Sequence, residues 1–283
     1  MADTVTAPAV RAAKGTRKLT MITAYDAPTA AIADRSGVDM ILVGDSLANV
    51  VLGHPTTLSV TVDDMVHHTA AVTRSAGRAF VIADMPWLSY HVSVEETVRN
   101  AGRLVREAGA GAVKLEGGRK RLPMIEAVLN AEIPVMGHLG LTPQSVHAMG
   151  GYTVQGREVA AARDLLQDAK ALDAAGIFAL VLEGVPDVLA RLVTERVTVP
   201  TIGIGAGGDC DGQVLVFHDA LGLHDGHYPK FVRRYAGLFD DAVAALTAYC
   251  EDVRSGDFPG PDETYSMPEE TARALLEEPP FGA

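Results

Sequence analysis

Ionisable residues recur directly after short apolar runs of this sequence, where a folded chain can bring them together. They are Asp45 with Ser46, Asp84, Lys114 with Glu116, His138, Glu183, and His218 with Asp219. Several carboxylates around one lysine repel one another and are poorly solvated unless a cation lies among them. Carboxylate oxygens suit a hard divalent ion, and Mg²⁺ typically takes one or two of them beside substrate and water. The pattern therefore favours a metal site.

Each of these residues also has a simpler structural interpretation when it is taken alone. An Asp after a strand is commonly the N-cap of the next helix, which would account for Asp45 or Asp84 singly. We assign Asp26, which follows the first apolar run, to such a capping or turn role. Lys114 and Glu116 could form a buried structural ion pair. Neither interpretation explains why the set recurs at the same end of successive runs.

The apolar runs alternate with amphipathic stretches of helical length. Eight runs rich in Val, Ile and Leu predict strands buried on both faces: Leu19–Tyr25, Asp39–Asp45, Phe80–Asp84, Ala112–Glu116, Pro134–Leu139, Ile177–Glu183, Pro200–Gly205 and Val214–Phe217. Helices are expected at Val60–Ser75, Val94–Ala108, Arg119–Asn130, Arg157–Ala175 and Pro186–Glu195. This alternation predicts an α/β fold, a (β/α)8 TIM barrel. The stretch between Gly205 and Val214 is too short for a full helix, so a doubly wound open sheet remains an alternative.

In such a barrel, functional side chains lie at the C-terminal ends of the strands. Alternation along one strand places Lys114 and Glu116 on one face, above Ala112, and the apolar Val113 and Leu115 on the other. The apolar pair suits a surface under helices, so Lys114 and Glu116 are predicted to point toward the barrel axis. The same alternation aligns three further carboxylates: Asp45 with Val43 and Ile41, Asp84 with Ile82 and Phe80, and Glu183 with Val181 and Ala179.

Composition excludes several classes of function. The 283 residues contain 36 acids and 24 bases, a net charge of −12, so no nucleic-acid or membrane partner is expected. Cys210 and Cys250 form no CxxC pair, which favours a reducing compartment. The sequence shows neither an apolar run of the roughly 18 residues that a membrane span needs nor a secretory signal. We expect a soluble, cytoplasmic protein that acts on small molecules.

The two ends of the chain differ from its middle. Residues 1–18 lack periodicity and are expected to be a flexible leader, and residues 19–254 are expected to form the barrel. Residues 255–283 are predicted to be an acidic, proline-containing tail, since the chain from Glu251 onward holds nine acids and two bases. This tail could be solvated, or it could be an arm that packs on a neighbouring subunit.

Three other features have weaker functional interpretations. His224 and His227 have a spacing compatible with metal ligation, but they lack a nearby third partner and are assigned as loop histidines. The run Gly203–Gly208 could bind a phosphate or let a ligand approach the backbone closely. Trp87 and Tyr90 could stack on an aromatic ligand, although core packing is the ordinary role of either.

Seven segments of the sequence, taken together and in order, resemble the ketopantoate hydroxymethyltransferase family. They are MILVGDSL, FVIADMPWLSY, AVKLEGG, PVMGHLGLTPQSVHAMGGYTVQGR, LVLEGVP, IGIGAGGDCDGQVLVFHDALGL and KFVRRYA. The resemblance spans about residues 19–258 and leaves the leader and most of the tail outside. It implies a barrel of the phosphoenolpyruvate/pyruvate-binding superfamily type and a homodecamer.

The resemblance also implies a reaction and the residues that carry it. The one-carbon unit of 5,10-methylenetetrahydrofolate is transferred to 3-methyl-2-oxobutanoate, giving 2-dehydropantoate and tetrahydrofolate in pantothenate biosynthesis. One Mg²⁺ per subunit would be held by Asp45, Asp84 and Glu116. The substrate-binding residues would be Asp45, Ser46, Asp84, Lys114 and His138, and Glu183 would be the catalytic base.

The substrate explains why such groups are needed. Its C3 hydrogen is only weakly acidic, and Mg²⁺ chelated by the carboxylate and keto oxygens would stabilise the enolate. Lys114 would add a second positive charge, and Glu183 would remove the hydrogen. Two alternatives share the barrel, namely a Schiff-base aldolase using Lys114 and another Mg²⁺-dependent 2-keto-acid lyase. A third is a non-enzymatic phosphate binder built on Gly203–Gly208.

Overall fold

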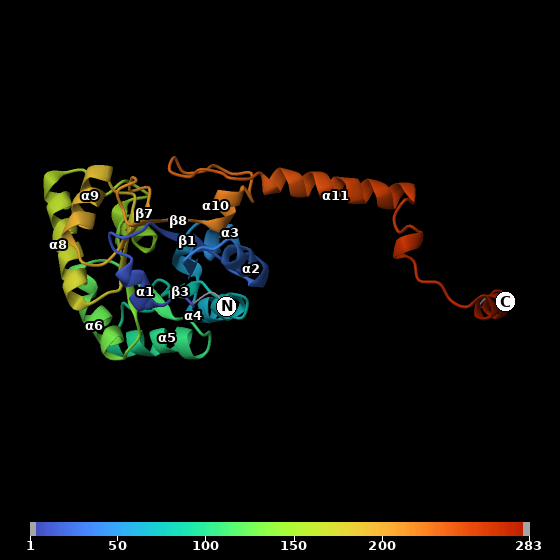
Figure 1. Cartoon of the computed structure of the whole chain (residues 1–283), viewed down its shortest axis with the longest axis horizontal. Coiled ribbons are helices and arrows are strands. Elements are labelled where there is room, and N and C mark those ends of the chain that lie inside the picture. Colours follow the sequence, from blue (N-terminus) through green and yellow to red (C-terminus); the bar gives the residue numbers. More distant parts are fainter. Residues whose placement is uncertain (1–3, 280–283) are drawn as a thin grey trace.

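The structure is a computed structural model that describes residues 4–279, and eight parallel strands form a closed barrel at its centre (Figure 1). The strands are β1 (Leu19–Thr23), β2 (Met40–Val43), β3 (Phe80–Asp84), β4 (Ala112–Glu116), β5 (Val135–Gly140), β6 (Ala179–Glu183), β7 (Thr201–Ile204) and β8 (Gly212–Leu215). Each strand pairs with the next along the chain, and β8 pairs with β1 through partners such as Leu19 and Gly212. This closure confirms the predicted TIM barrel and excludes the open sheet.

Six longer helices follow the strands and surround the barrel: α2 (Ala27–Arg35), α4 (Val62–Thr73), α5 (Val94–Arg106), α6 (Leu122–Asn130), α8 (Val159–Ala175) and α9 (Asp187–Arg196). Shorter turns lie in the connections: α3 (Leu47–Val50), η1 (Thr57–Ser59), η2 (Arg119–Arg121), η3 (Pro143–Ser145), α7 (Val146–Met149) and α10 (Phe217–Leu221). Asp26 caps α2, because its carboxylate accepts the backbone N–H of Thr29 at 2.8 Å. The capping role predicted for Asp26 is therefore confirmed.

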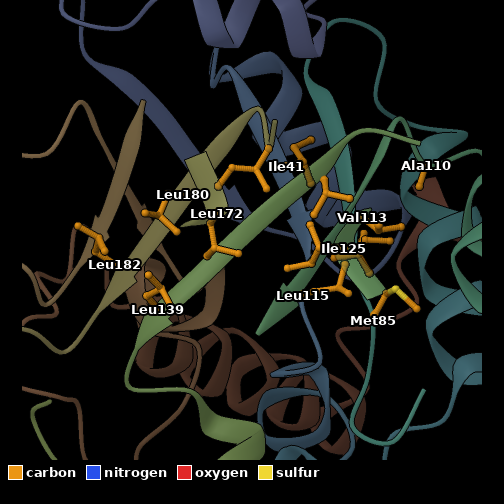
Figure 2. Packing of buried hydrophobic residues seen from close by; sticks show 14 of the residues in the cluster. Ile41, Met85, Ala110, Val113, Leu115, Ile125, Leu139, Leu172, Leu180 and Leu182 are labelled. Carbon is orange, nitrogen blue, oxygen red and sulfur yellow. The ribbon is translucent and has the colours of Figure 1, made fainter. Parts of the chain in front are cut away.

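Two layers of apolar side chains hold the barrel. The outer layer joins the strands to the helices, and Figure 2 shows Val113, Leu115 and Leu180 within it. The inner layer fills the barrel with residues such as Met40, Leu42, Ile82, Ala112 and Met136. Burying residues on both faces of every strand explains why the strands appear in the sequence as nearly continuous apolar runs.

The predicted side-chain alternation holds on β4 and breaks at the end of β2. Lys114 and Glu116 face the inside above Ala112, as expected. On β2, however, Ile41 and Val43 belong to the outer layer, although Asp45 was aligned with them. Asp45 nevertheless faces the cavity. Strand β2 ends at Val43, and the chain turns at Gly44, so Asp45 does not follow the alternation of the strand.

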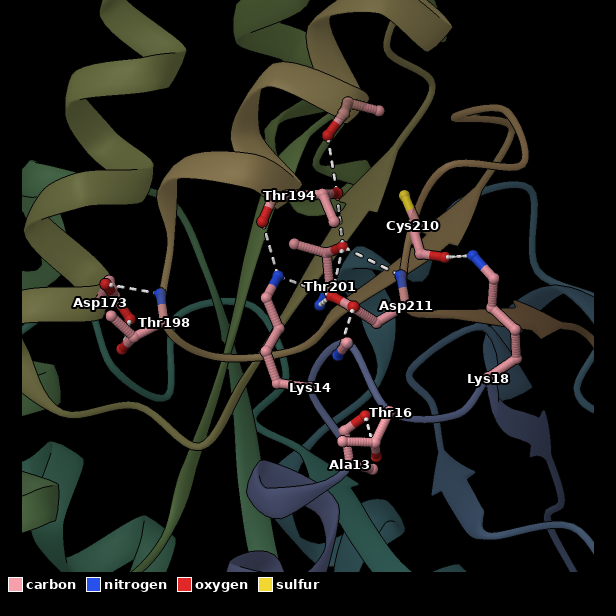
Figure 3. A network of polar contacts seen from close by, with 12 residues as sticks. Ala13, Lys14, Thr16, Lys18, Asp173, Thr194, Thr198, Thr201, Cys210 and Asp211 are labelled. Carbon is pink, nitrogen blue, oxygen red and sulfur yellow. Dashed lines mark hydrogen bonds and ion pairs between the residues drawn. The ribbon is translucent and has the colours of Figure 1, made fainter.

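The leader is ordered in its described part, which differs from the flexible segment expected for residues 1–18. Helix α1 (Ala7–Ala12) places Val5 and Val10 against the inner layer and closes the N-terminal end of the barrel. Just after this helix, Lys14 Nζ forms an ion pair with Asp211 Oδ2 at 2.8 Å (Figure 3). The expectation was wrong for residues 4–18 because a six-residue helix is too short to show periodicity. Residues 1–3 lie outside the described residues.

The chain after the barrel extends away from it (Figure 1). Helix α11 (Leu238–Ser255), which was predicted as part of the barrel domain, buries none of its residues, and the turn η4 (Pro261–Glu263) and helix α12 (Glu269–Leu276) follow it. Apolar side chains such as Leu246 and Tyr249 are exposed on α11. Among the described residues, no helix combines the length and the hydrophobicity needed to cross a membrane.

Candidate active site

The C-terminal end of the barrel contains a cavity of about 200 Å³. Its walls include every residue that the sequence singled out for metal, substrate or base: Asp45, Ser46, Asp84, Lys114, Glu116, His138 and Glu183. Strand register brings them together, since Asp84 lies beside Lys114, Glu116 beside His138, and Gly140 beside Glu183. These residues therefore share one cavity, at the end of the barrel where chemistry is expected.

Two glycines allow this close arrangement. A Cβ on Gly44 would lie 2.7 Å from Ser46 Oγ, so any other residue there would force the Ser46 hydroxyl to move. Gly140 has a positive φ of +94°, and a Cβ there would lie 2.2 Å from the backbone oxygen of Glu183. These contacts explain why both strand ends carry glycine next to the candidate site.

Lys114 is the positive charge at the centre of the cavity. Its Nζ lies 2.9 Å from Asp84 Oδ1 and 3.8 Å from Glu116 Oε1. Burial alone would lower the pKa of Lys114, but the charges of Asp84, Glu116 and Asp45 outweigh burial and raise it above its ordinary value. Lys114 is therefore an ammonium group at neutral pH.

His138 connects this cluster to Glu183. Its Nδ1 lies 3.0 Å from Lys114 Nζ, and its Nε2 lies 3.3 Å from Glu183 Oε2. Burial and Lys114 lower the pKa of His138, but Glu116 and Glu183 outweigh them and raise it to about 9. The contact with Lys114 instead favours a neutral ring, whose Nδ1 accepts from the ammonium. Nε2 carries a hydrogen whether the ring is neutral or protonated. It lies near the Glu183 carboxylate without a hydrogen bond of normal geometry.

The three carboxylates of the cluster carry more negative charge than Lys114 balances. Burial, followed by the charges of Asp84 and Glu116, raises the pKa of Asp45 well above its ordinary value. Burial also raises the pKa of Asp84, against the lowering effect of Lys114. Burial has the same tendency at Glu116, but His138 and Lys114 outweigh it and lower the pKa of that carboxylate. A bound cation would relieve the repulsion around Asp45.

The donor set fits a divalent ion that is held partly by substrate and water. No group of three or more His, Cys, Asp or Glu side chains in residues 4–279 is arranged closely enough to enclose an ion alone. The Lys114 ammonium lies within 4 Å of both Asp84 and Glu116. Asp84 Oδ1 is buried and makes no hydrogen bond of normal geometry, although it is ion-paired with Lys114. Mg²⁺ needs only one or two such carboxylates.

Gln144 is a residue of the site that the sequence reasoning missed. Its Nε2 donates to Asp45 Oδ2 at 2.9 Å and to the backbone oxygen of Met85 at 3.0 Å. Its Oε1 accepts from the hydroxyl of Tyr90 at 2.6 Å, and its backbone N–H donates to Glu116 Oε2 at 3.1 Å. Gln144 therefore fixes two of the candidate metal ligands. Tyr90 has a structural role here, as core packing predicted.

Ser46 and the remaining polar residues have separate partners. The Ser46 hydroxyl lies 2.8 Å from the hydroxyl of Tyr25, a second residue that the sequence did not single out. Asp219 lines the cavity and lies 2.9 Å from His224 Nε2. His224 is thus engaged within its loop, in agreement with its assignment as a loop histidine.

Sequence comparisons with known proteins all indicate the same family. A sequence model of ketopantoate hydroxymethyltransferase matches residues 4–261. The chain is 57% identical over 275 residues to the 3-methyl-2-oxobutanoate hydroxymethyltransferase of Syntrophobacter fumaroxidans, covering 97% of this chain and 98% of that one. It is 56% identical over 262 residues to the enzyme of the same name from Moorella thermoacetica, covering 92% and 97%.

Solved structures with a similar fold have much lower sequence identity. A phosphonopyruvate hydrolase in complex with oxalate and Mg²⁺ has a TM-score of 0.60 at 15% identity, covering 96% of this chain and 95% of that one. A 2,3-dimethylmalate lyase of the PEP mutase/isocitrate lyase superfamily has a TM-score of 0.58 at 17% identity, covering 96% and 94%. At this identity the similarity establishes the barrel fold alone.

Proposed function

The chain belongs to the ketopantoate hydroxymethyltransferase family, and on that premise we propose that it transfers the one-carbon unit of 5,10-methylenetetrahydrofolate to 3-methyl-2-oxobutanoate. The products are 2-dehydropantoate and tetrahydrofolate, and the reaction belongs to pantothenate biosynthesis. Family membership makes the chain a transferase. The folate donor, the Mg²⁺ cofactor and the pathway are parts of the proposal.

One observation carries the proposal. Three buried carboxylates and the Lys114 ammonium share a small cavity with Glu183, which lies at the end of a strand three positions further around the barrel than Asp84. Such a site can hold an anionic keto acid through positive charge while a separate carboxylate approaches its carbon chain. That division of roles is what removing a hydrogen next to a carbonyl requires.

Asp45, Asp84 and Glu116 would hold Mg²⁺, with Glu116 able to act through water. When bound, the ion would supply positive charge at the keto and carboxylate oxygens of the substrate. Gln144 keeps Asp45 and Glu116 in place, and Lys114 contributes a fixed charge beside them. Ser46 and His138 line the same cavity and could form hydrogen bonds to the substrate.

Glu183 is proposed as the base that removes the C3 hydrogen of the keto acid. His138 Nε2 lies 3.3 Å from Glu183 Oε2 and can orient that carboxylate toward the substrate. In the net reaction C3 loses its hydrogen and gains a bond to the transferred carbon, while both bonds from that carbon to folate nitrogens break. Water supplies the new hydroxyl group, and the three hydrogens released end on that hydroxyl and the two nitrogens.

The test is exchange of the C3 hydrogen in heavy water without folate, followed by NMR. Wild-type enzyme with Mg²⁺ should exchange it, and EDTA should abolish the exchange until Mg²⁺ is restored. Glu183→Gln should slow exchange at least about 10²-fold, the usual contribution of a general base. Thermal stabilisation by keto acid with Mg²⁺ should persist in that variant. The control is Glu195→Gln on the exposed surface of α9, which should behave as wild type.

Each outcome has a defined meaning. Rapid exchange in Glu183→Gln would assign the base to another residue, and exchange that is insensitive to EDTA would contradict the role of Mg²⁺. The alternative function is that of a keto-acid lyase of the same superfamily. Only the similarity in fold supports it, because the lyase and hydrolase structures are 15–17% identical to this chain. Product analysis by NMR distinguishes cleavage of a keto acid from its hydroxymethylation.

We also propose that the protein acts in the cytoplasm as a homo-oligomer, with the decamer of the family as the expected form. The support from this chain is α11, which extends from the barrel with apolar residues such as Val243, Leu246 and Tyr249 exposed. Exposed apolar surface of this kind is costly unless a partner covers it. Sedimentation velocity of the purified protein measures the mass of the assembly directly.

A further inference from the structure

A second and larger cavity opens beside the candidate active site. Its volume is about 760 Å³, within the usual range for sites that bind organic cofactors. Its walls come from the segment after β5, the ends of β6 and β7, and the segment before α11: Leu141, Tyr152, Thr153, Val154, Glu183, Gly184, Gly205, Gly207, Pro229, Lys230 and Phe231. These segments are far apart in sequence and meet only at the barrel mouth.

The two cavities adjoin each other. Tyr152, Glu183, Pro229 and Phe231 line both of them. Glu183 therefore lies on the boundary between the small polar cavity and the larger one. A molecule in the larger cavity would lie next to the group that we propose as the base, and hence next to the carbon from which that base takes a proton.

The larger cavity is apolar and presents two aromatic side chains. Tyr152 is 54% exposed and Phe231 is 39% exposed, so parts of both side chains are open to a ligand. Gly205 has φ +61°, and a Cβ there would lie 2.8 Å from the Phe231 ring. Gly205 thus lets this ring pack directly on the backbone. Flat aromatic ligands are the class that such walls favour.

Lys230 supplies a cation at the same cavity. It is exposed and takes part in none of the ion pairs found among residues 4–279. An ammonium group beside apolar walls can bind the carboxylate end of a ligand whose rings occupy the rest of the space. The cavity therefore combines aromatic walls, a volume large enough for an organic cofactor and one positive charge.

We propose that the reduced folate co-substrate binds in this second cavity, with its ring system against Tyr152 and Phe231 and its glutamate carboxylates near Lys230. This proposal rests on the proposed function and names where the folate binds. The transferred carbon would then be presented across the Glu183 boundary to the keto acid. The aromatic rings, the benzoyl spacer and the anionic end of a folate match the three features of the cavity.

A third cavity, of about 700 Å³, is the competing location. It contains the basic residues Arg119, Lys120 and Arg121, and it reaches Glu116 from outside. It shares Glu116 with the active-site cavity, but Glu183, the proposed base, is not among its walls. A folate there would not lie next to the proposed base. Lys120 therefore provides a matched control for Lys230.

The experiment measures binding of tetrahydrofolate, which carries no one-carbon unit, by calorimetry in the presence of Mg²⁺ and keto acid. Phe231→Ala should weaken binding about tenfold or more, in line with the usual loss on removing a stacking ring, and Phe231→Tyr should restore most of it. Lys230→Ala should weaken binding several-fold, whereas Lys120→Ala should leave it unchanged. Folate-free C3 exchange, which reports the keto-acid site, should persist in Lys230→Ala, because Lys230 lines only the larger cavity.

The outcomes separate the folate site from the proposed function. Wild-type enzyme that binds no tetrahydrofolate would overturn the folate-dependent function itself. Normal binding in both Phe231→Ala and Lys230→Ala would overturn only the assignment of this cavity, and a loss in Lys120→Ala would move the site to the third cavity. Loss of C3 exchange in Phe231→Ala, with no recovery in Phe231→Tyr, would show that Phe231 serves the keto-acid site instead.

Discussion

The packing of the N-terminal helix is open to a quantitative test. Val10 is fully buried by α1 against the inner layer of the barrel. Val10→Ala removes two methylene equivalents, each worth about 0.8 kcal/mol of burial, and leaves a small cavity. We expect a loss of about 1.5–3 kcal/mol in the free energy of unfolding. At about 2–4 °C per kcal/mol for a domain of this size, Tm should fall by roughly 3–12 °C.

The matched control is Val188→Ala on α9, where the side chain is 54% exposed. Both substitutions place Ala in a helix, so the gain in helix propensity of up to about 0.5 kcal/mol is common to them and cancels. Calorimetry at one protein concentration should show a loss in Tm for Val10→Ala alone. C3 exchange at 25 °C should be normal in both variants, because the site lies at the opposite end of the barrel. Equal Tm values would refute the packing of α1 into the barrel.

Two further predictions concern buried polar contacts. Gln144→Met leaves the Asp45 carboxylate and the Met85 carbonyl without their hydrogen-bond donor and removes one of the partners of the Tyr90 hydroxyl. We therefore expect a loss of about 2–5 kcal/mol in urea unfolding, with weaker keto-acid binding. A loss below about 0.5 kcal/mol would contradict this positioning role. At Asp34, partial burial raises the pKa, but three backbone N–H donors outweigh it and lower the pKa. This stabilisation is complete above the unfolded pKa of about 3.9 and is lost as pH falls through the lower folded pKa. Asp34→Ala should therefore destabilise at pH 7 and much less near pH 2, and a cost independent of pH would contradict the contacts.

The barrel was predictable because its strands are buried on both faces and its helices are amphipathic. Those patterns are local, and they gave the strand count and the inward direction of Lys114 and Glu116. Prediction was less accurate where the backbone leaves the regular strand. Asp45 lies beyond the last residue of β2, so alternation along that strand could not determine its direction.

The missed residues depend on contacts between distant parts of the chain. Gln144 is an uncharged residue in a turn, and its importance arises from contact with Asp45, 99 positions earlier. Tyr152 and Phe231 meet only because the segments before α8 and before α11 converge over β6 and β7. Short-range patterns contain no signal for such pairs. The family segment that contains LTPQSV did include Gln144, and this was the one available indication.

The charge of Lys114 distinguishes two ways in which a barrel can form a carbon nucleophile. A Schiff-base aldolase needs a neutral amine that attacks the substrate carbonyl. Asp84 at 2.9 Å and Glu116 at 3.8 Å raise the pKa of Lys114 and keep it protonated, against the opposing effect of burial. An ammonium group cannot attack, but it can stabilise an enolate without forming a bond to it. The same carboxylates that suit a divalent ion therefore prevent Lys114 from acting as a nucleophile, and the site favours enolate chemistry over imine chemistry.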